Sequence, residues 1–440
     1  MMNGKQFAGM RSLLIALLGG MLLMSCSNAS PRTDNMDGQM SWPFNLQQWA
    51  DQDGKFYING EAEGYVSVFD AQTLTKLKTI SFWDYEYKQR EDSGKALDEE
   101  AKDFIQKNAR PHHSWISPGG KYNYVSNNSK GWERMWVVDT RTDNIVTHID
   151  TGGMGPLHGS FSPFRDIAAF GAVQDKKKGM VTFIDLKTHK VIGTVKTSGI
   201  QTRDMFFTPD NKHLYVSNSG WDPDKGVMGG VDMIDIDAMK VVKTFDIPGS
   251  RGMKMNSDGT LAAVASIRKG FVAIIDAKNH KILAKVDVGS KPNNVQFHPD
   301  NTRVYVGLAG DKQFAVIDLK TMSVKAKIAG GKEANAVYFP PGRSDIAIAT
   351  NEADDFVTVI DTKNDTKIKD ILTPLGAHNI SYSPDGKRAI VSCRKSREAV
   401  FLDVEALEEI DIIPDAGHAN NGVRWVPYGS GLGTKKPYDG

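Results

Sequence analysis

The chain has only two cysteines among its 440 residues, Cys26 and Cys393. It therefore lacks the CxxCH motif that attaches a c-type haem. It also lacks the paired cysteines of a binuclear copper centre or an iron–sulfur cluster. Any metal or haem would have to be held without these arrangements.

The chain also lacks an excess of either charge. Lys and Arg number 54 against 53 Asp and Glu, which gives a formal net charge of +1. No basic stripe with interleaved aromatic residues is present, so we expect no nucleic-acid partner. The sequence contains no nucleophile elbow, Walker loop, HExxH or paired-carboxylate motif, and it leaves open whether the protein is an enzyme.

Residues 1–25 have the pattern of a lipoprotein signal peptide. Lys5 and Arg11 precede an apolar run, 13–24, which is too short to span a membrane as a mature helix. Leu23-Met24-Ser25-Cys26 resembles a bacterial lipobox, in which Cys26 receives the lipid. The alternative is an ordinary secretory peptide with an incidental cysteine. We expect residues 26–50 to be the lipidated cysteine with a flexible tether, and the protein to be periplasmic and membrane-anchored. Only Cys393 then remains apart from the anchor, so the mature chain forms no internal disulfide.

A repeat of slightly more than 40 residues dominates the rest of the chain. Clear copies are WISPGGKYNYVSNN (115–128), FTPDNKHLYVSN (207–218), FHPDNTRVYVG (297–307) and YSPDGKRAIVS (382–392). Each is followed by an alternating apolar run that ends in aspartate. From Asp139 to Asp403 these aspartates are 46, 50, 41, 42, 43 and 42 residues apart. Such a period, with four short strands per unit, is typical of a β-propeller blade.

The repeats predict an all-β fold, an eight-bladed β-propeller over residues 51–430 with a tail at 431–440. Each unit provides strands A to D, from the "SP" segment to the segment after the aspartate. The first unit lacks an A strand, and the segment at about 421–427 matches the A pattern with no B strand after it. We therefore expect the C-terminal strand to complete the first blade and close the ring.

The repeated aspartates are explained by the scaffold. An aspartate at the end of strand C can accept hydrogen bonds from amides two residues on, so we interpret these residues as turn formers. His148, His189, His213 and His280 fall at turns or strand edges, where we expect them to be solvated.

One insertion interrupts the period, because Asp70 and Asp139 are 69 residues apart. The surplus lies in 83–110. Leu97, Ala101, Phe104 and Ile105 have the spacing of an amphipathic helix, at about 95–108. We expect this helical insertion on a rim, where it either caps the channel, meets a partner or is a surface excursion.

Aligning the A strands on the "SP" proline, or on the equivalent residue, reveals a polar ring where the repeat stops repeating. The second residue before the proline is always bulky and apolar or aromatic, as in an interblade core. The fifth residues before the proline are His113, His158, Asp204, Gly252, Asn294, Asn335, Asn379 and Gly422. The sixth residues are His112, Leu157, Arg203, Arg251, Asn293, Ala334, His378 and Asn421.

This ring is the candidate site, at the mouth of the central channel. Imidazoles suit copper, zinc or haem iron, so His112, His113, His158 and His378, with His418 just before the closing strand, are candidate metal ligands. Arg203 and Arg251 could hold a carboxylate-bearing ligand such as a tetrapyrrole. The candidate ligand-binding residues are His113, His158, His378, Arg203, Arg251, Asn294 and Asn335. The alternative is that these polar side chains only line a wet channel.

The repeats in 113–427 resemble the YVTN repeats, including the eight-bladed domain of cytochrome d1 nitrite reductases and of proteins of d1-haem biosynthesis. Within 90–165, "ARPHHSWISPGGKYNYVSNN" and "GPLHGSF" are similar to His-bearing blade starts of the nitrous-oxide reductase propeller. That resemblance implies copper ligation by His112, His113 and His158. The reductase cluster needs histidines from nearly every blade, however, and this chain has Arg203, Gly252, Asn294 and Asn335 at comparable starts.

Two hypotheses follow. The first is an accessory or redox protein of respiratory nitrogen-oxide metabolism, with d1-type haem or copper at the channel mouth and a periplasmic redox or assembly protein as partner. The second is a non-catalytic scaffold that binds a protein partner through the propeller rim.

Overall fold

The computed structural model describes residues 54–129, 131–153, 155–156, 158–174, 178–220, 229–417 and 422–427, all within one compact unit, Pro31–Gly440. Three of the predicted features lie outside the described residues: the signal peptide and tether with Cys26, the tail at 431–440, and His418.

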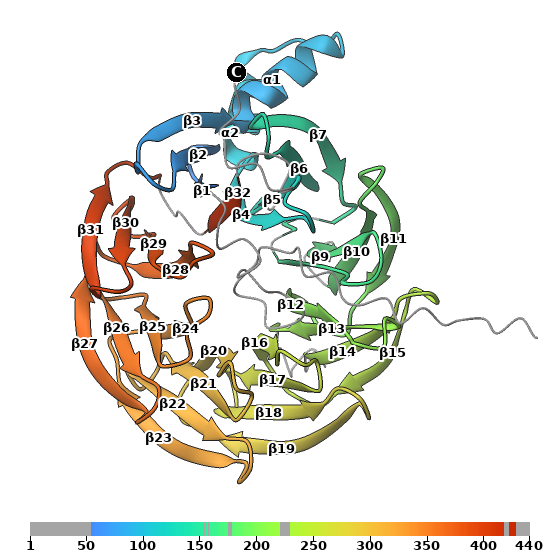
Figure 1. Ribbon diagram of the computed structural model, residues 1–440. Coiled ribbons are helices and arrows are strands. Elements are labelled where there is room, and N and C mark those ends of the chain that lie inside the picture. Colours follow the sequence, from blue (N-terminus) through green and yellow to red (C-terminus); the bar gives the residue numbers. More distant parts are fainter. Residues whose placement is uncertain are drawn as a thin grey trace, which may run out of the picture. The chain divides into compact units, whose positions relative to one another are not determined.

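The described residues form eight four-stranded antiparallel sheets in a ring (Figure 1), which confirms the predicted eight-bladed propeller. In blades 2 to 8 the chain passes from the innermost strand to the outermost, whereas the innermost strand of blade 1 is the last strand of the chain. Blade 1 contains β32 (Val423–Pro427), β1 (Gly54–Gly60), β2 (Tyr65–Asp70) and β3 (Lys76–Ser81). Blades 2 and 3 contain β4 (Pro111–Ile116), β5 (Tyr122–Asn127), β6 (Arg134–Asp139), β7 (Asn144–Asp150), β8 (Gly159–Phe161), β9 (Ile167–Gln174), β10 (Lys178–Asp185) and β11 (Lys190–Lys196).

The remaining five blades continue around the ring. Blades 4 and 5 contain β12 (Thr202–Phe207), β13 (His213–Asn218), β14 (Gly230–Asp235), β15 (Lys240–Phe245), β16 (Ser250–Met255), β17 (Leu261–Ser266), β18 (Phe271–Asp276) and β19 (Lys281–Asp287). Blades 6 to 8 contain β20 (Pro292–Phe297), β21 (Arg303–Leu308), β22 (Gln313–Asp318), β23 (Ser323–Ala329), β24 (Ala334–Tyr338), β25 (Ile346–Asn351), β26 (Phe356–Asp361), β27 (Thr366–Leu372), β28 (Ala377–Tyr382), β29 (Arg388–Cys393), β30 (Glu398–Asp403) and β31 (Glu408–Ile413).

The two ends of the propeller sequence meet in blade 1, as the incomplete first repeat predicted. Strand β32 pairs antiparallel with β1, and Trp425 lies opposite Phe56. Trp425 is 2% exposed, and Phe56 also contacts Phe401 of blade 8 with ring centroids 5.5 Å apart. Closure thus removes the free inner edge of β1 and joins blade 1 to its neighbour.

The eight aspartates at the ends of the third strands form turns, as predicted. In every blade the carboxylate accepts hydrogen bonds from the backbone amides two and three residues on. The residue four positions after each aspartate then has a positive φ. These carboxylates therefore serve the scaffold.

The insertion contains two helices where the sequence pattern predicted one. The predicted helix corresponds to α2 (Glu99–Asn108), whose Ala101 and Ile105 are buried while Phe104 is 45% exposed. The additional helix, α1 (Phe82–Asp92), lies at the outer edge of the ring between β3 and β7 (Figure 1). Its buried Glu86 accepts from Trp136 at 2.7 Å and pairs with Arg134. Within the described residues, neither helix is long and apolar enough to cross a membrane.

Candidate functional site

A cavity of about 370 Å³ lies where the inner strands begin, at the mouth of the central channel. The sequence predicted this position for the polar ring. Six of the inner strands have a β-bulge there, seen in β12 as a register shift between Thr202 and Met205. The two residues inside each bulge are the ring residues, such as Arg203 and Asp204. Bulges release side chains from the alternation of a strand, so both residues of the pair can reach the cavity.

Three histidines converge on one side of the cavity. His112 and His113 are the bulge residues of β4, and His158 directly precedes β8 of the next blade. The imidazole centroids of His112 and His113 are 4.3 Å apart, and those of His113 and His158 are 5.4 Å apart. One nitrogen from each ring lies within 4.8 Å of the others, which is close enough for all three to ligate one ion after small side-chain adjustments.

A carboxylate stands behind each of three cavity histidines. Glu61 lies 2.6 Å from His112 Nδ1, and Asp204 lies 3.2 Å from His158 Nδ1. The third pair joins Glu352 to His378 Nδ1 at 3.3 Å. Because a carboxylate only accepts, it favours a proton on Nδ1 and leaves Nε2 with a lone pair. Metal-binding histidines usually have such a partner.

Burial favours the neutral form of two histidines of the cluster, His113 and His158. Burial and the neighbouring His112 hold the pKa of His113 well below its usual range, and burial also lowers that of His158 despite its contact with Asp204. His113 Nδ1 is buried and has no hydrogen-bond partner among the described residues. An unpaired buried nitrogen is costly, and a bound ion would satisfy it.

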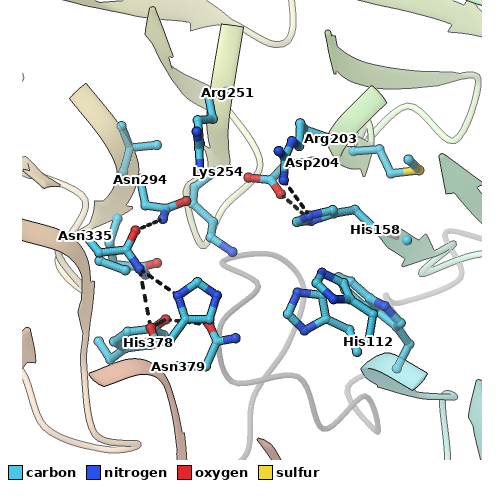
Figure 2. Close-up of a pocket in the computed structure, with 18 of the residues that line it drawn as sticks. His112, His158, Arg203, Asp204, Arg251, Lys254, Asn294, Asn335, His378 and Asn379 are labelled. Atoms are coloured by element: carbon cyan, nitrogen blue, oxygen red, sulfur yellow. Dashed lines mark hydrogen bonds and ion pairs between the residues drawn. The ribbon is translucent and has the colours of Figure 1, made fainter. Parts of the chain in front are cut away.

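The cavity is also rich in cations, and one of them, Arg203, lies 3.5 Å from His158 Nε2. Arg203, Arg251, Lys254, Arg394 and Arg424 all line it. Figure 2 shows Lys254 extending into the cavity and His378 facing His112 across it. Burial, and then Arg251, lower the pKa of Arg203 to about 10, so this guanidinium is still charged at neutral pH. The cations outnumber the lining carboxylate Asp204 and the nearby Glu61 and Glu352, and this balance favours an anionic ligand.

All seven predicted ligand-binding residues line this cavity. His378 does not belong to the three-histidine cluster. The sequence alignment placed Asn335 wrongly by one residue. Counting back from Pro340 matched Asn335 to Asp204, whereas the strand register shows that it occupies the position of Arg203 in its blade. The turn after β24 has two consecutive prolines and one extra residue, so counting back from the first proline misplaced this blade. Asn335 accepts from Asn294 at 2.7 Å and lies 3.4 Å from His378 Nδ1.

Sequence reasoning missed the carboxylates Glu61 and Glu352. Each directly follows the second strand of its blade, β1 or β25. Because the first two strands form an antiparallel hairpin, the end of the second lies beside the start of the first. Aligning the residues that follow the second strands would have revealed both glutamates, together with Asn128 and Arg394.

The expectation that four other histidines are solvated was wrong. His148 bonds to Tyr85, and His189 and His280 bond to Tyr124 and Tyr215. His213 pairs with Asp210 at 2.8 Å. Each is only partly exposed.

Comparison with known proteins identifies the fold. No family model matches the sequence. The chain is 22% identical over 175 residues to Antigen Lp49 of Leptospira interrogans, a match that covers 40% of this chain and only 38% of that relative.

Several solved structures are similar over most of this chain. The dihydro-haem d1 dehydrogenase NirN in complex with DHE matches 86% of this chain and 75% of its own, with 13% identity and a TM-score of 0.63. AztD of Citrobacter koseri matches 88% of this chain and all of its own, with 14% identity and a TM-score of 0.61. Hydrazine synthase of Kuenenia stuttgartiensis matches 71% and 96%, with 18% identity and a TM-score of 0.50. At these identities the likeness concerns the fold, and the chain has the cytochrome d1-like eight-bladed β-propeller fold that its repeats predicted.

Proposed function

We propose that this protein binds a transition-metal ion, zinc or copper, at the channel mouth through His112, His113 and His158. The observation that carries the proposal is the convergence of three imidazole nitrogens within 4.8 Å of one another. Imidazole is a ligand of both metals. The group fits the donors, because His113 Nδ1 has no other partner among the described residues and carboxylates orient His112 and His158.

Three protein ligands leave one position of a tetrahedral ion open. That position faces a cavity lined by arginines, so an anion or an anionic group of a ligand can occupy it next to the metal. When bound, the metal supplies a Lewis acid at this point. The chain itself supplies three imidazole ligands, carboxylates that orient His112 and His158, and cationic side chains around the cavity.

A d1-type haem is a second candidate, favoured by the arrangement of the cations. His378 faces the three-histidine cluster across the cavity, and Arg203 and Arg251 lie on its wall (Figure 2). A tetrapyrrole between the two sides would find an imidazole for its iron and guanidinium groups for its carboxylates. The fold likeness to a haem d1 dehydrogenase is consistent with this candidate.

We further propose that the protein acts outside the cytoplasm, anchored to a membrane by lipid on Cys26, as an accessory or redox protein. A place in respiratory nitrogen-oxide metabolism, with a periplasmic redox or assembly protein as partner, belongs to the same proposal. It rests on the sequence pattern of the N-terminus and on the resemblance of the repeats.

The test is a set of titrations of metal-stripped protein. Zinc, and copper(I) under reducing conditions, are titrated against a chromophoric chelator, and haemin is titrated by absorbance. The H113A/H158A double variant should lose one equivalent of metal relative to the wild type. H378A is the matched control, since it removes an imidazole from the same cavity but from outside the cluster, and it should retain that equivalent.

Each other outcome has a distinct meaning. Haemin binding that H378A and R203A both abolish, with no metal equivalent lost in H113A/H158A, would favour the tetrapyrrole. A protein that binds neither metal nor haemin would contradict both candidates and favour the rim scaffold.

A further inference from the structure

The propeller has a second group of possible metal ligands, far from the channel mouth. It lies between blades 4 and 5 and consists of Asp210, His213 and His280. Asp210 and His213 follow β12 at the end opposite Arg203. Because a strand rises about 3.3 Å per residue, the six residues of β12 separate the two sites by roughly 20 Å.

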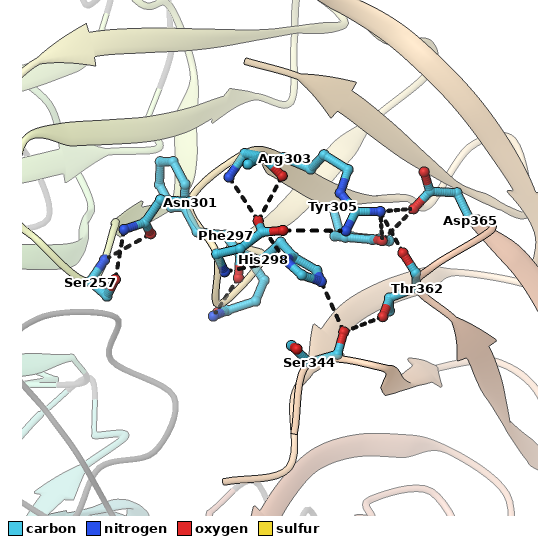
Figure 3. A network of polar contacts seen from close by, with 12 residues as sticks. Ser257, Phe297, His298, Asn301, Arg303, Tyr305, Ser344, Thr362 and Asp365 are labelled. Atoms are coloured by element: carbon cyan, nitrogen blue, oxygen red, sulfur yellow. Dashed lines mark hydrogen bonds and ion pairs between the residues drawn. The ribbon is translucent and has the colours of Figure 1, made fainter. Parts of the chain in front are cut away.

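Equivalent positions at two other blade junctions hold an ion pair. Two positions are compared at each junction. The first lies at or next to the start of the second strand of a blade. The second is the positive-φ residue in the outer turn of the next blade. Between blades 1 and 2 these positions hold Lys55 and Asp143, which form an ion pair at 2.5 Å. Between blades 6 and 7 they hold Arg303 and Asp365, paired at 2.8 Å (Figure 3). At these two junctions a cation and a carboxylate thus join neighbouring blades.

Between blades 4 and 5 the same positions hold two histidines. His213 replaces the cation and His280 replaces the carboxylate, with ring centroids 5.0 Å apart. Asp210 lies 2.8 Å from His213 Nδ1 and 3.8 Å from His280 Nε2. The ion pair of those two junctions is therefore replaced by two imidazoles and a carboxylate, which is a set of donors for a metal ion.

Hydrogen bonds orient His280 and Asp210, and Asp210 in turn contacts His213. Tyr215 contacts His280 Nδ1 at 2.6 Å, which leaves Nε2 directed at Asp210. One oxygen of Asp210 is held by Thr208 and by the amide of Lys212, and the other oxygen faces the histidines. The side chains of His213 and His280 are 16% and 21% exposed, so an ion can reach them from solvent.

We propose that Asp210, His213 and His280 bind one divalent transition-metal ion, which links blade 4 to blade 5. The ion takes the place of the cation–carboxylate pair found between blades 1 and 2 and between blades 6 and 7. This proposal is independent of the channel-mouth site, because the two sites share no residue.

The junction between blades 2 and 3 supplies a matched control. His189 occupies the same position as His280, also with a positive φ, and also contacts a tyrosine, Tyr124, at 2.7 Å. Its neighbour in the position of His213 is Tyr122, with ring centroids 4.6 Å apart, and Gly119 stands in the position of Asp210. H189A therefore removes the same contact with tyrosine without removing a metal ligand.

The experiment is a zinc titration of the metal-stripped protein against a competing chelator. Four proteins are compared, besides the H189A control: the wild type, D210N/H213A, H113A/H158A, and the variant that carries all four substitutions. We expect D210N/H213A to bind one equivalent fewer than its parent in both backgrounds, and H189A to bind as much as the wild type. Zinc should also raise the midpoint of thermal unfolding of H113A/H158A, and this shift should disappear when D210N/H213A is added.

Two results would overturn the proposal. One is an unchanged zinc stoichiometry in D210N/H213A, and the other is an equal loss in H189A. Both are read separately from the channel-mouth site, since H113A/H158A alone reports on that site. Retention of the native circular dichroism spectrum shows that a lost equivalent is not a loss of fold, and H213A alone serves if the double variant does not fold.

Discussion

Replacing Glu61 by Gln should weaken metal binding at the channel mouth without removing the site. Glu61 is 2% exposed and lies 2.6 Å from His112 Nδ1, 2.9 Å from Arg110 and 2.7 Å from the amide of Asn128. Burial opposes the charge of Glu61, but the contacts with His112, Asn128 and Arg110 hold its pKa below the usual value. The carboxylate is therefore ionised at neutral pH. Gln keeps the shape and removes the charge that orients and polarises His112.

Loss of such a partner usually reduces metal affinity about 10- to 100-fold. At about 1.4 kcal/mol per tenfold change, this corresponds to about 1.4–2.7 kcal/mol of binding free energy. The assay is a competitive zinc titration of E61Q in the D210N/H213A background, so that only the channel-mouth site contributes. E352Q is the control, because Glu352 stands behind His378, which lies outside the three-histidine cluster. Equal affinities for E61Q and its parent, or equal losses in E61Q and E352Q, would refute the reasoning.

Three further predictions concern stability and location. Burial lowers the pKa of His378 to about 4, so as the pH falls below about 6.5 the unfolded chain takes up a proton on this residue before the folded protein does. The unfolding free energy should therefore fall by about 2–3 kcal/mol by pH 4.5. Urea denaturation of H378Q should show a correspondingly weaker loss of stability between pH 7 and 4.5, and equal losses in H378Q and the wild type would contradict this. W425A should lower the unfolding free energy by about 3–5 kcal/mol because Trp425 is 2% exposed in the closing strand. L372A, at a position 71% exposed, should change it by less than about 0.5 kcal/mol. Similar urea midpoints for the two variants would argue against closure as a main source of stability. C26A should move the protein from the membrane fraction to the soluble periplasmic fraction and abolish labelling by a radioactive fatty acid, and continued labelling would refute lipidation at Cys26.

The fold followed from the sequence because its signals are local and repeated. The turn aspartates and the alternating strands recur eight times, and most of the hairpins between the first two strands contain a proline, so each copy supports the others. The closing strand could be predicted because Trp425 and its neighbours match a pattern that the first repeat lacks. Helix α1 could not be predicted, because its sequence is mostly polar. The contact that stabilises it, Glu86 with Trp136, joins residues 50 positions apart.

The sequence predicted only those residues of the candidate site that lie on the first strand of each blade. His112, His113 and His158 were found because they interrupt the repeat at equivalent positions. Glu61 and Glu352 come from the neighbouring strand, and their pairing with histidines depends on how the two strands of the hairpin meet. The junction site was missed for a related reason, since His213 and His280 are 67 residues apart in sequence and come together only when two blades pack.

The most direct test of the central claim is the position of bound metal. Crystals of metal-stripped protein soaked in zinc, with diffraction measured on both sides of the zinc absorption edge, locate the ion by its anomalous signal. We predict a peak bonded to nitrogens of His112, His113 and His158 at about 2.0–2.1 Å. A channel mouth without such a peak, in crystals that bind zinc elsewhere, would contradict the proposed function.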